Sequence, residues 1–390
     1  MIYDSLIIHT EIWNNLLNVV SSGRLPHALL LHGNDGSGKE AHAIELSALI
    51  NCNLRSENGA CGNCPSCKKI KSFQHGNIKL IFPYPRGKIS SSNDPSIRGL
   101  TEKNIEKLRE MMLEKGNNPY ARIEIENART ILINSIREVK KELYMSRIDD
   151  GWTVVLIFEA EKLCIPQPNS ANALLKVLEE PPEKTIFILV TSEVSAMIDT
   201  IRSRCQQIYF PPLSSASIKE VLIKNNVPEN KTKVISNIAS GNVRLALDLS
   251  GNIDDLFSDL KLMIKAFYSS SPTTWQEVIN RTSTLKRRSL NELSYFFRTS
   301  ILYMRHLHLA KYDSSDDNLI FTNLDTHLRK IIIDYPNANW DECIDILENT
   351  FENIQRNGYL PLMITTMLIE IKQQILGKKL KPFSIHDWVL

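Results

Sequence analysis

The sequence has almost no net charge and no long hydrophobic run. Its 46 Lys and Arg residues nearly balance 44 Asp and Glu residues, which leaves a formal net charge of +2 over 390 residues. This balance excludes a protein that attracts nucleic acid through its overall charge, so any contact with DNA must be local or shared with partner chains. No apolar stretch approaches the roughly 18 residues of a membrane-spanning helix, so no membrane association is expected.

The first residues also lack the basic segment and the apolar core of a signal peptide. We therefore expect a cytoplasmic protein whose thiols stay reduced. No internal repeat is visible. Hydrophobic residues make up 43% of the chain, which is enough for globular cores, and the length favours two or three domains.

A glycine-rich loop, Gly33–Lys39, has the pattern G-x-x-x-x-G-K of a phosphate-binding loop. It follows an apolar run at 28–31 and precedes a helical pattern at 42–50, which is the context that this motif requires. Glycine lets backbone N–H groups approach phosphate oxygens, and a helix N-terminus adds a favourable dipole. Taken alone, the loop could equally be an ordinary strand-to-helix turn. The candidate nucleotide-binding residues are Gly33, Gly36, Gly38 and Lys39.

The residues that would hold Mg²⁺ in such a site are missing. Glu40 stands where a Ser or Thr hydroxyl is expected, and its carboxylate would repel phosphate oxygens. The run 154–160 looks like a Walker B strand, but Phe158 replaces the metal-binding Asp and only Glu159 remains of the acidic pair. Because phosphoryl transfer depends on metal-assisted charge neutralisation, we expect no intrinsic ATPase activity. ATP or ADP can still bind through Lys39 and the loop amides, whereas Mg²⁺ binding is disfavoured.

Four of the seven cysteines lie close together in the pattern C-x8-C-x2-C-x2-C. A CxxC pair lets two thiolates reach one ion, and four thiolates complete a closed tetrahedral site, so the pattern predicts one structural Zn²⁺. Disulfides are the alternative, which a reducing compartment disfavours. A redox CxxC would leave two cysteines unexplained. The predicted ligands are Cys52, Cys61, Cys64 and Cys67.

Apolar strands alternate with helical patterns in the first half of the chain. This alternation predicts an α/β domain with a parallel sheet covered by helices. After Pro211 and Pro212 the pattern is helical to the end. The residues around Ile131 are expected to begin one strand–helix step, and 76–120 are expected to form an insertion. The other expected strands are 28–31, 154–158 and 186–191, and the helices between them are near 136–146 and 168–179.

Further motifs resemble a known family. In order along the chain they are Leu25–Ala28, Asn172–Pro182, Thr200–Gln206 and Gly241–Leu247. Together with the glycine loop and the four cysteines, they resemble the AAA+ clamp-loader subunits of bacterial DNA polymerase III over about residues 1–250. The pattern is most similar to the delta-prime type, because the gamma/tau type is expected to keep Lys-Ser or Lys-Thr in the loop and Asp-Glu in Walker B.

The resemblance implies three domains and a set of partners. Residues 1–210 would form an AAA+ P-loop domain carrying a zinc knuckle at about 52–67. Residues 211–253 would form a helical lid, and residues 254–390 an all-helical collar used for oligomerisation. The implied partners are other clamp-loader subunits of the gamma/tau and delta types, with the sliding clamp and primed DNA reached through the complex.

The resemblance also implies roles for individual residues. Arg204 matches an arginine finger, which projects into the ATP site of a neighbouring subunit; the alternative is a surface ion pair. Arg244 matches the sensor-2 arginine of the lid, and Thr191 lies where a sensor-1 polar residue is expected; either could instead cap a helix or pack. Glu159 would be an inactive remnant of the catalytic Walker B pair.

The function that fits these features best is a non-hydrolysing, delta-prime-like subunit of the clamp loader in the DNA-directed DNA polymerase III holoenzyme. An active gamma/tau-type ATPase is the first alternative. The second is a zinc-stabilised DNA-binding module, for which the basic segment 281–311 would be a candidate surface. We favour an ordinary solvated helix face for that segment, because phosphate affinity requires the charges to converge on one surface.

Overall fold

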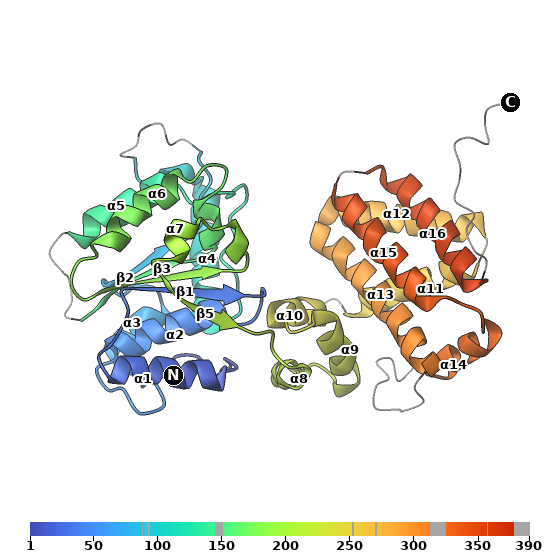
Figure 1. Ribbon diagram of the computed structural model, residues 1–390, viewed down its shortest axis with the longest axis horizontal. Helices are drawn as coiled ribbons and strands as arrows, with labels where there is room; N and C mark the ends of the chain where they lie inside the picture. Colours follow the sequence, from blue (N-terminus) through green and yellow to red (C-terminus); the bar gives the residue numbers. More distant parts are fainter. Residues whose placement is uncertain are drawn as a thin grey trace. The chain divides into compact units, whose positions relative to one another are not determined.

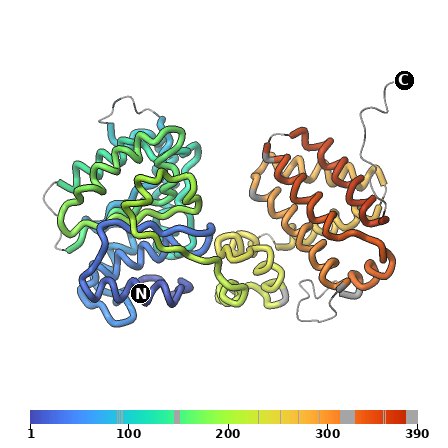
Figure 2. The backbone as a smooth tube through the Cα atoms, in the orientation of Figure 1, coloured from blue at the N-terminus to red at the C-terminus, as the bar shows by residue number. Residues whose placement is uncertain are grey.

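The computed structural model describes residues 1–87, 89, 91, 94–144, 151–251, 253–269, 271–312, 325–356 and 358–377. The chain divides into two compact units, which Figure 2 lets the reader trace by colour along the chain. The first unit is Met1–Val221 with Gly241–Leu245, and the second is Leu222–Ser240 with Ala246–Leu390. This division is coarser than the three domains expected from the sequence, which stay a prediction.

A five-stranded parallel sheet forms the centre of the first unit. The strand order is β2-β3-β4-β1-β5, and every neighbouring pair is parallel. Residues Leu29, Leu30 and Leu31 of the central strand are all buried, as expected for a strand covered on both faces. The predicted parallel α/β architecture is therefore confirmed. The strands are β1 (Ala28–Gly33), β2 (Ile78–Ile81), β3 (Thr153–Ile157), β4 (Thr185–Thr191) and β5 (Gln206–Phe210).

Helices cover both faces of this sheet. Figure 1 shows α2 and α3 on one face and α5 and α6 on the other. On the second face, Phe187 of the sheet packs in one buried cluster with Ile136 of α5 and Leu174 of α6. The helices of this unit are α1 (Thr10–Ser21), α2 (Lys39–Asn51), α3 (Pro65–Lys71), α4 (Glu102–Asn117), α5 (Ile133–Leu143), α6 (Asn169–Glu179) and α7 (Asp199–Arg202).

Three strands differ from the sequence-based expectation. No strand forms in the described residues around Ile131; its N–H donates instead to the carbonyl of Lys162, and α5 begins two residues later. On the side away from β4, strand β3 pairs with β2, which lies inside the segment 76–120 that was expected to be an insertion. The other missed strand is β5, so Arg204 precedes the last strand instead of following it. Both are short edge strands with partly exposed residues, which give little apolar signal.

The described part of the second unit contains helices and no strands. Helix α13 packs against α11, α12, α14 and α15, and α16 packs against α11, α12 and α15. Phe297, Tyr303, Trp340 and Ile364 are among its fully buried side chains. The predicted helical C-terminal region is therefore confirmed. Its helices are α9 (Glu229–Ala239), α11 (Ile253–Tyr268), α12 (Pro272–Arg288), α13 (Leu290–Tyr312), α14 (Asp325–Asp334), α15 (Trp340–Gln355) and α16 (Leu360–Ile375).

Two further helices, α8 (Ser215–Lys224) and α10 (Val243–Gly251), cross the division between the units. Residues Gly241–Leu245, at the start of α10, belong to the first unit and supply Arg244 to it. Across the ranges that the structure describes, no helix combines the length and the apolar character needed to cross a bilayer.

Candidate functional site

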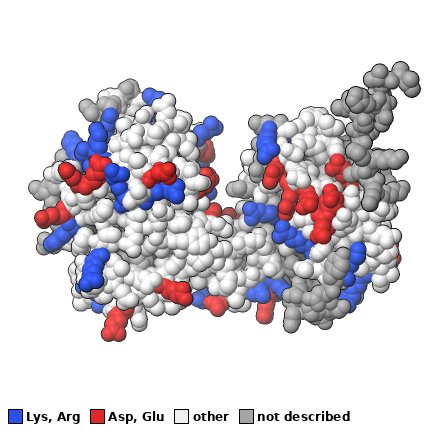
Figure 3. Space-filling view, viewed as in Figure 1, with Lys and Arg blue, Asp and Glu red and all other residues white. Residues whose placement is uncertain are grey.

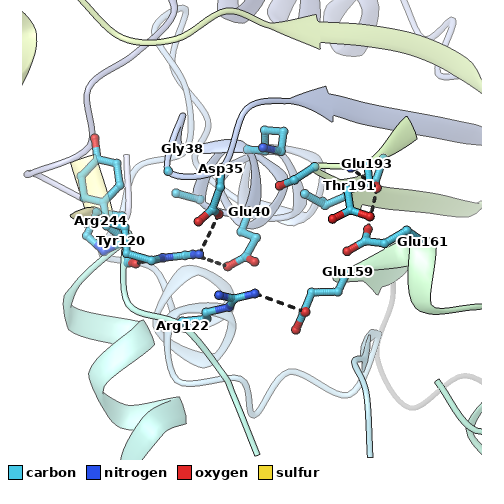
Figure 4. Close-up of a pocket in the computed structure, with 16 residues that line it drawn as sticks. Asp35, Gly38, Glu40, Tyr120, Arg122, Glu159, Glu161, Thr191, Glu193 and Arg244 are labelled. Carbon is cyan, nitrogen blue, oxygen red and sulfur yellow. Dashed lines mark hydrogen bonds and ion pairs between the residues drawn. The ribbon is translucent and has the colours of Figure 1, made fainter. Parts of the chain in front are cut away.

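A pocket of about 250 Å³ lies in the first unit, at the carboxyl ends of β1, β3 and β4. In open α/β sheets this edge is where ligands bind. Because β4 lies between β1 and β3, Thr191 at the end of β4 sits between the glycine loop and Glu159. The structure thus brings most of the residues selected from the sequence to one place, as Figure 4 shows. Those that line the pocket are Gly36, Gly38, Lys39, Glu159, Thr191 and Arg244.

Gly33 lies at a close contact between two strands, not at the pocket. It is the last residue of β1 and has a positive φ of 141°, and a Cβ atom there would lie 2.1 Å from the carbonyl oxygen of Phe210 in β5. The close approach of two paired strands therefore requires glycine at this position. Gly33 is not among the residues that line the pocket.

Lys39 holds the glycine loop together from within. Its ammonium donates to the carbonyl oxygens of Gly33 at 2.8 Å and of Asn34 at 2.6 Å. Burial lowers the pKa of Lys39 to about 8, although nearby carboxylates raise it. The lysine that should meet phosphate is thus bonded to its own loop.

Two histidines fix the start of α2. His42 is fully buried, and its Nδ1 lies 2.9 Å from the carbonyl oxygen of Gly38, while its Nε2 accepts a hydrogen bond from the backbone N–H of His9. The Nε2 of His9 lies 3.0 Å from the carbonyl oxygen of Ser37. Burial lowers the pKa of His42 to about 4. His42 is therefore neutral at neutral pH, with its proton on Nδ1.

Glu40 forms a buried ion pair with Lys115. The ammonium of Lys115 lies 2.5 Å from a carboxylate oxygen of Glu40, and the side chain of Lys115 is completely buried while that of Glu40 is 16% exposed. Although burial alone would raise it, Lys115 and Arg244 lower the pKa of Glu40 to about 2. Burial lowers the pKa of Lys115, against the opposing effect of Glu40. The charge that the sequence predicts will repel phosphate is thus balanced by a lysine from α4.

The same lysine reaches the second altered position of the site. Its Nζ lies 5.8 Å from the centre of the Phe158 ring, a distance at which an ammonium is attracted to an aromatic face. Glu40 and Phe158 stand at the two positions where residues that contact Mg²⁺ were expected from the sequence. Both residues adjoin the same buried cation, Lys115.

Arg244 is bound on three sides within the pocket. Its guanidinium donates to Asp35 at 2.9 Å, to Glu40 at 3.5 Å and to the carbonyl oxygen of Tyr120 at 3.0 Å. Gly36 permits this approach, since a Cβ atom there would lie 1.8 Å from Asn242 Oδ1. The lid residue predicted to contact nucleotide is thus held by two carboxylates.

Glu159 and Thr191 are also bound to other side chains of the chain. Glu159 lies 2.5 Å from the Lys162 ammonium and 3.3 Å from the Arg122 guanidinium. Thr191 donates its hydroxyl to Glu161 at 2.5 Å. Burial raises the pKa of Glu161. Glu159 therefore faces two cations of the protein itself.

Sequence reasoning missed Lys115, Tyr120 and Arg122. All three come from the end of α4 and the loop that follows it. Lys115 and Tyr120 lie in the segment 76–120 that was set aside as an insertion, and Arg122 lies two residues beyond it. Lys115 meets Glu40 across 75 positions of sequence. The only signal for it was Glu40 itself, because a carboxylate in a buried phosphate-binding loop requires a partner cation.

The four cysteines converge as predicted. Their sulfur atoms all lie within 4.8 Å of one another, with Cys52 to Cys64 at 3.9 Å and Cys61 to Cys67 at 4.0 Å. Four thiolates at about 2.3 Å from one Zn²⁺ would be about 3.8 Å apart, so the spacing fits the ion. All seven cysteines are free thiols in this structure.

Arg204 lies outside the pocket, between α7 and β5. Its guanidinium donates to Glu179 at 2.7 Å and to the carbonyl oxygen of Thr200 at 3.0 Å. The side chain is 36% exposed and that of Glu179 is 51% exposed. In the isolated chain Arg204 therefore forms an exposed ion pair, which is worth little energy.

The basic segment 281–311 does not form a uniform charged surface. Arg281 is bonded to Asp259 at 2.7 Å and Arg305 to Glu348 at 2.8 Å. Figure 3 shows acidic and basic side chains together on the visible face of the second unit. This mixture does not favour the DNA-binding alternative.

The fold and the site together define a class of protein. A glycine loop opens α2 after β1, an acidic residue follows β3, a polar residue ends the strand between them, and an arginine enters from a separate helical segment. This is the arrangement of a P-loop α/β protein of the AAA+ type.

The family follows from comparison with known proteins. Residues 8–214 match the family described as "DNA polymerase III, delta subunit", which is more than half of the chain. The chain belongs to this family of bacterial clamp-loader AAA+ proteins and is delta-prime-like.

Curated relatives agree with this assignment. The DNA polymerase III subunit delta' of Bacillus subtilis is 29% identical over 65% of this chain and 62% of its own length. The gamma subunit of Buchnera aphidicola from Schizaphis graminum is 31% identical over 60% of this chain and 53% of its own length. The chain thus spans little more than half of the length of these relatives.

Among solved structures, a DNA polymerase III gamma subunit-related protein from Thermotoga maritima is similar to this chain. It is 15% identical, with 93% of this chain and 99% of that chain covered and a TM-score of 0.39.

The buried His42 predicts a loss of stability in mild acid. The unfolded chain takes up a proton on this residue near pH 6.5, whereas the folded chain does so only near pH 4. The unfolded state therefore binds more protons between these values, and folding should weaken by about 3 kcal/mol as the pH falls from 6.5 to 4. Denaturant unfolding at several pH values should show a shallower dependence for His42→Gln than for the wild type. Equal slopes for the two proteins would contradict the assignment of a neutral His42.

Proposed function

We propose that this chain is a non-hydrolysing, delta-prime-like subunit of the DNA polymerase III clamp loader. In this role it supplies Arg204 to the ATP site of a neighbouring subunit while the sliding clamp is loaded onto primed DNA. The observation that carries the first part is that every cation lining the pocket is already paired inside the chain: Lys39 with loop carbonyls, Arg122 with Glu159, and Arg244 with Asp35 and Glu40.

These pairings oppose ATP hydrolysis for a definite reason. Catalysis of phosphoryl transfer depends on cations that are free to meet the charge developing on the phosphate oxygens. Here Arg122 and Arg244 neutralise carboxylates of the protein, and Lys39 is bonded to carbonyl oxygens of its own loop. ATP or ADP would have to replace Asp35 and Glu40 as the partners of Arg244 before it could be held.

The position of Arg204 supports a role in trans. The residue lies outside the chain's own pocket, and its partner Glu179 sits in an exposed ion pair that a phosphate group could replace at low cost. A guanidinium presents a rigid planar fork that suits phosphate oxygens. A subunit that cannot hydrolyse ATP can therefore still contribute to hydrolysis by its neighbour.

The proposed assembly uses both units of the chain. We assign residues 211–253 to a lid and 254–390 to a collar that joins the ring of gamma/tau-type and delta-type subunits. The similarity to gamma subunits leaves an active ATPase as the second candidate, which measured turnover by this chain would support.

We further propose that the cysteine cluster holds one structural Zn²⁺. The four thiolates would fill the coordination sphere and leave no open position for water, so the ion would fix the loop between α2 and α3 and take no part in a reaction.

Cys64→Ser should remove the metal and lower the free energy of unfolding by more than about 3 kcal/mol, because structural zinc contributes its binding energy to folding. Elemental analysis of protein purified without chelator should find one zinc per chain in the wild type. Cys164→Ser, whose thiol lies outside the cluster, should keep the metal. Wild-type protein without zinc, or Cys64→Ser protein that retains one equivalent, would contradict the assignment.

Arg204→Ala should reduce ATP hydrolysis by a reconstituted clamp loader without preventing its assembly. Loss of an arginine finger can slow one site by about 10³-fold or more, and the other sites should keep the total rate from vanishing. Clamp loading onto primed DNA should fall more than assembly does, and Arg204→Lys should restore little, because an ammonium lacks the planar fork.

Arg202→Ala is the matched control for this experiment. Arg202 is two residues away, is also 36% exposed and also forms an exposed ion pair, with Asp199. Its loss should leave hydrolysis and loading unchanged. If Arg204→Ala and Arg202→Ala changed ATP hydrolysis and clamp loading equally, Arg204 would be only a surface arginine.

A further inference from the structure

One short segment contacts four separate parts of the first unit, at the pocket and next to it. Residues Lys115–Arg122, here called the strap, run from the last turns of α4 into the loop that follows it. Lys115 bonds to Glu40 at the start of α2, and Arg122 to Glu159 after β3. Tyr120 makes two contacts: its hydroxyl accepts the N–H of Ile7 at 2.9 Å, and its carbonyl accepts Arg244 at 3.0 Å. Figure 4 shows Tyr120 and Arg122 among the lining residues.

The strap is a tightly bonded structure in its own right. Besides Glu40, the ammonium of Lys115 donates to the carbonyl oxygens of Pro119 at 3.1 Å and of Ala121 at 2.7 Å, which closes the loop around the buried charge. The hydroxyl of Tyr3 donates to the carbonyl of Lys115 at 2.9 Å. Tyr120 is only 4% exposed. The ammonium of Lys115 thus orders the loop of the strap and binds the strap to the start of α2.

The strap leaves little room and few free charges for a ligand. The remaining cavity of about 250 Å³ is smaller than the roughly 300–1,000 Å³ typical of small-molecule sites. Of the three cations that line it, Arg122 belongs to the strap and Arg244 is bonded to it. A nucleotide would therefore have to compete with the strap for both space and partners.

We propose that the strap takes the place of a nucleotide in the pocket. The strap holds the glycine loop, Ile7, Glu159 and Arg244 in one arrangement without any nucleotide. This inference deepens the proposed non-hydrolysing role and rests on it. Because only molecules with a displaced strap can bind nucleotide, the apparent affinity falls in proportion to the fraction that is open. Substitutions that loosen the strap should raise that affinity.

The test measures amide hydrogen exchange and ADP binding by the full-length chain. If the strap acts as one unit, Lys115→Met should accelerate exchange at Ile7 by about tenfold or more, although Lys115 makes no bond to Ile7. Tyr120→Ala should accelerate exchange at the start of α2 and at 241–245. Tyr120→Ala should also strengthen ADP binding by at least about tenfold, since it opens the pocket without changing its charge.

Lys107→Met is the matched control, because Lys107 lies on the same helix in an exposed ion pair with Glu126. It should change neither measurement. If Tyr120→Ala fails to fold, Tyr120→Phe keeps the ring, removes only the bond to Ile7, and should still accelerate exchange at Ile7 and at 241–245.

Unchanged exchange at Ile7 in folded Lys115→Met protein would overturn the proposal. So would a wild-type chain that binds ADP as tightly as Tyr120→Ala. Neither measurement involves a partner subunit or Arg204. The exchange and ADP-binding results can therefore be interpreted even if the proposed clamp-loading role fails its own test.

Discussion

The buried ion pair between Glu40 and Lys115 is the interaction on which the pocket of the first unit depends. Glu40 stands at the N-terminus of α2, where the helix dipole favours a negative charge. A phosphate would normally take that position in a glycine-loop protein. Here the first turn of α2 carries a carboxylate of the chain itself, and a completely buried lysine neutralises it. Removing either partner alone would leave a buried charge without its main counter-ion, which is more costly than removing both.

This ion pair explains why the other charges of the pocket are arranged as they are. With Glu40 negative and fixed, Arg244 has a permanent anionic partner, and Asp35 completes its binding. Glu159 keeps its place after β3 but faces Lys162 and Arg122. The fold of an ATPase is thus retained while its cations serve the protein itself. Function in such a fold is decided by the site, and in the proposed role the exposed Arg204 acts on ATP in a neighbour's pocket.

The sequence predicted the features that local patterns encode. The glycine loop, the four cysteines, the parallel sheet and the helical second half all follow from spacing and periodicity, and Glu159, Thr191 and Arg244 meet in one pocket. The short edge strands β2 and β5 were missed because partly exposed strands carry weak apolar patterns. Lys115, Tyr120 and Arg122 could not be found because their partners are distant in sequence, and nothing in the pattern of α4 distinguishes Lys115 from the exposed Lys107.

The central claim is that the chain's own pocket has lost hydrolysis because its cations are used internally. The most direct measurement is steady-state phosphate release by the purified chain with ATP and Mg²⁺, compared with Lys39→Ala. We predict a rate at background that Lys39→Ala does not change, since Lys39 is already bonded to its own loop. A wild-type rate above background that disappears in Lys39→Ala would contradict it and would identify the chain as an active ATPase.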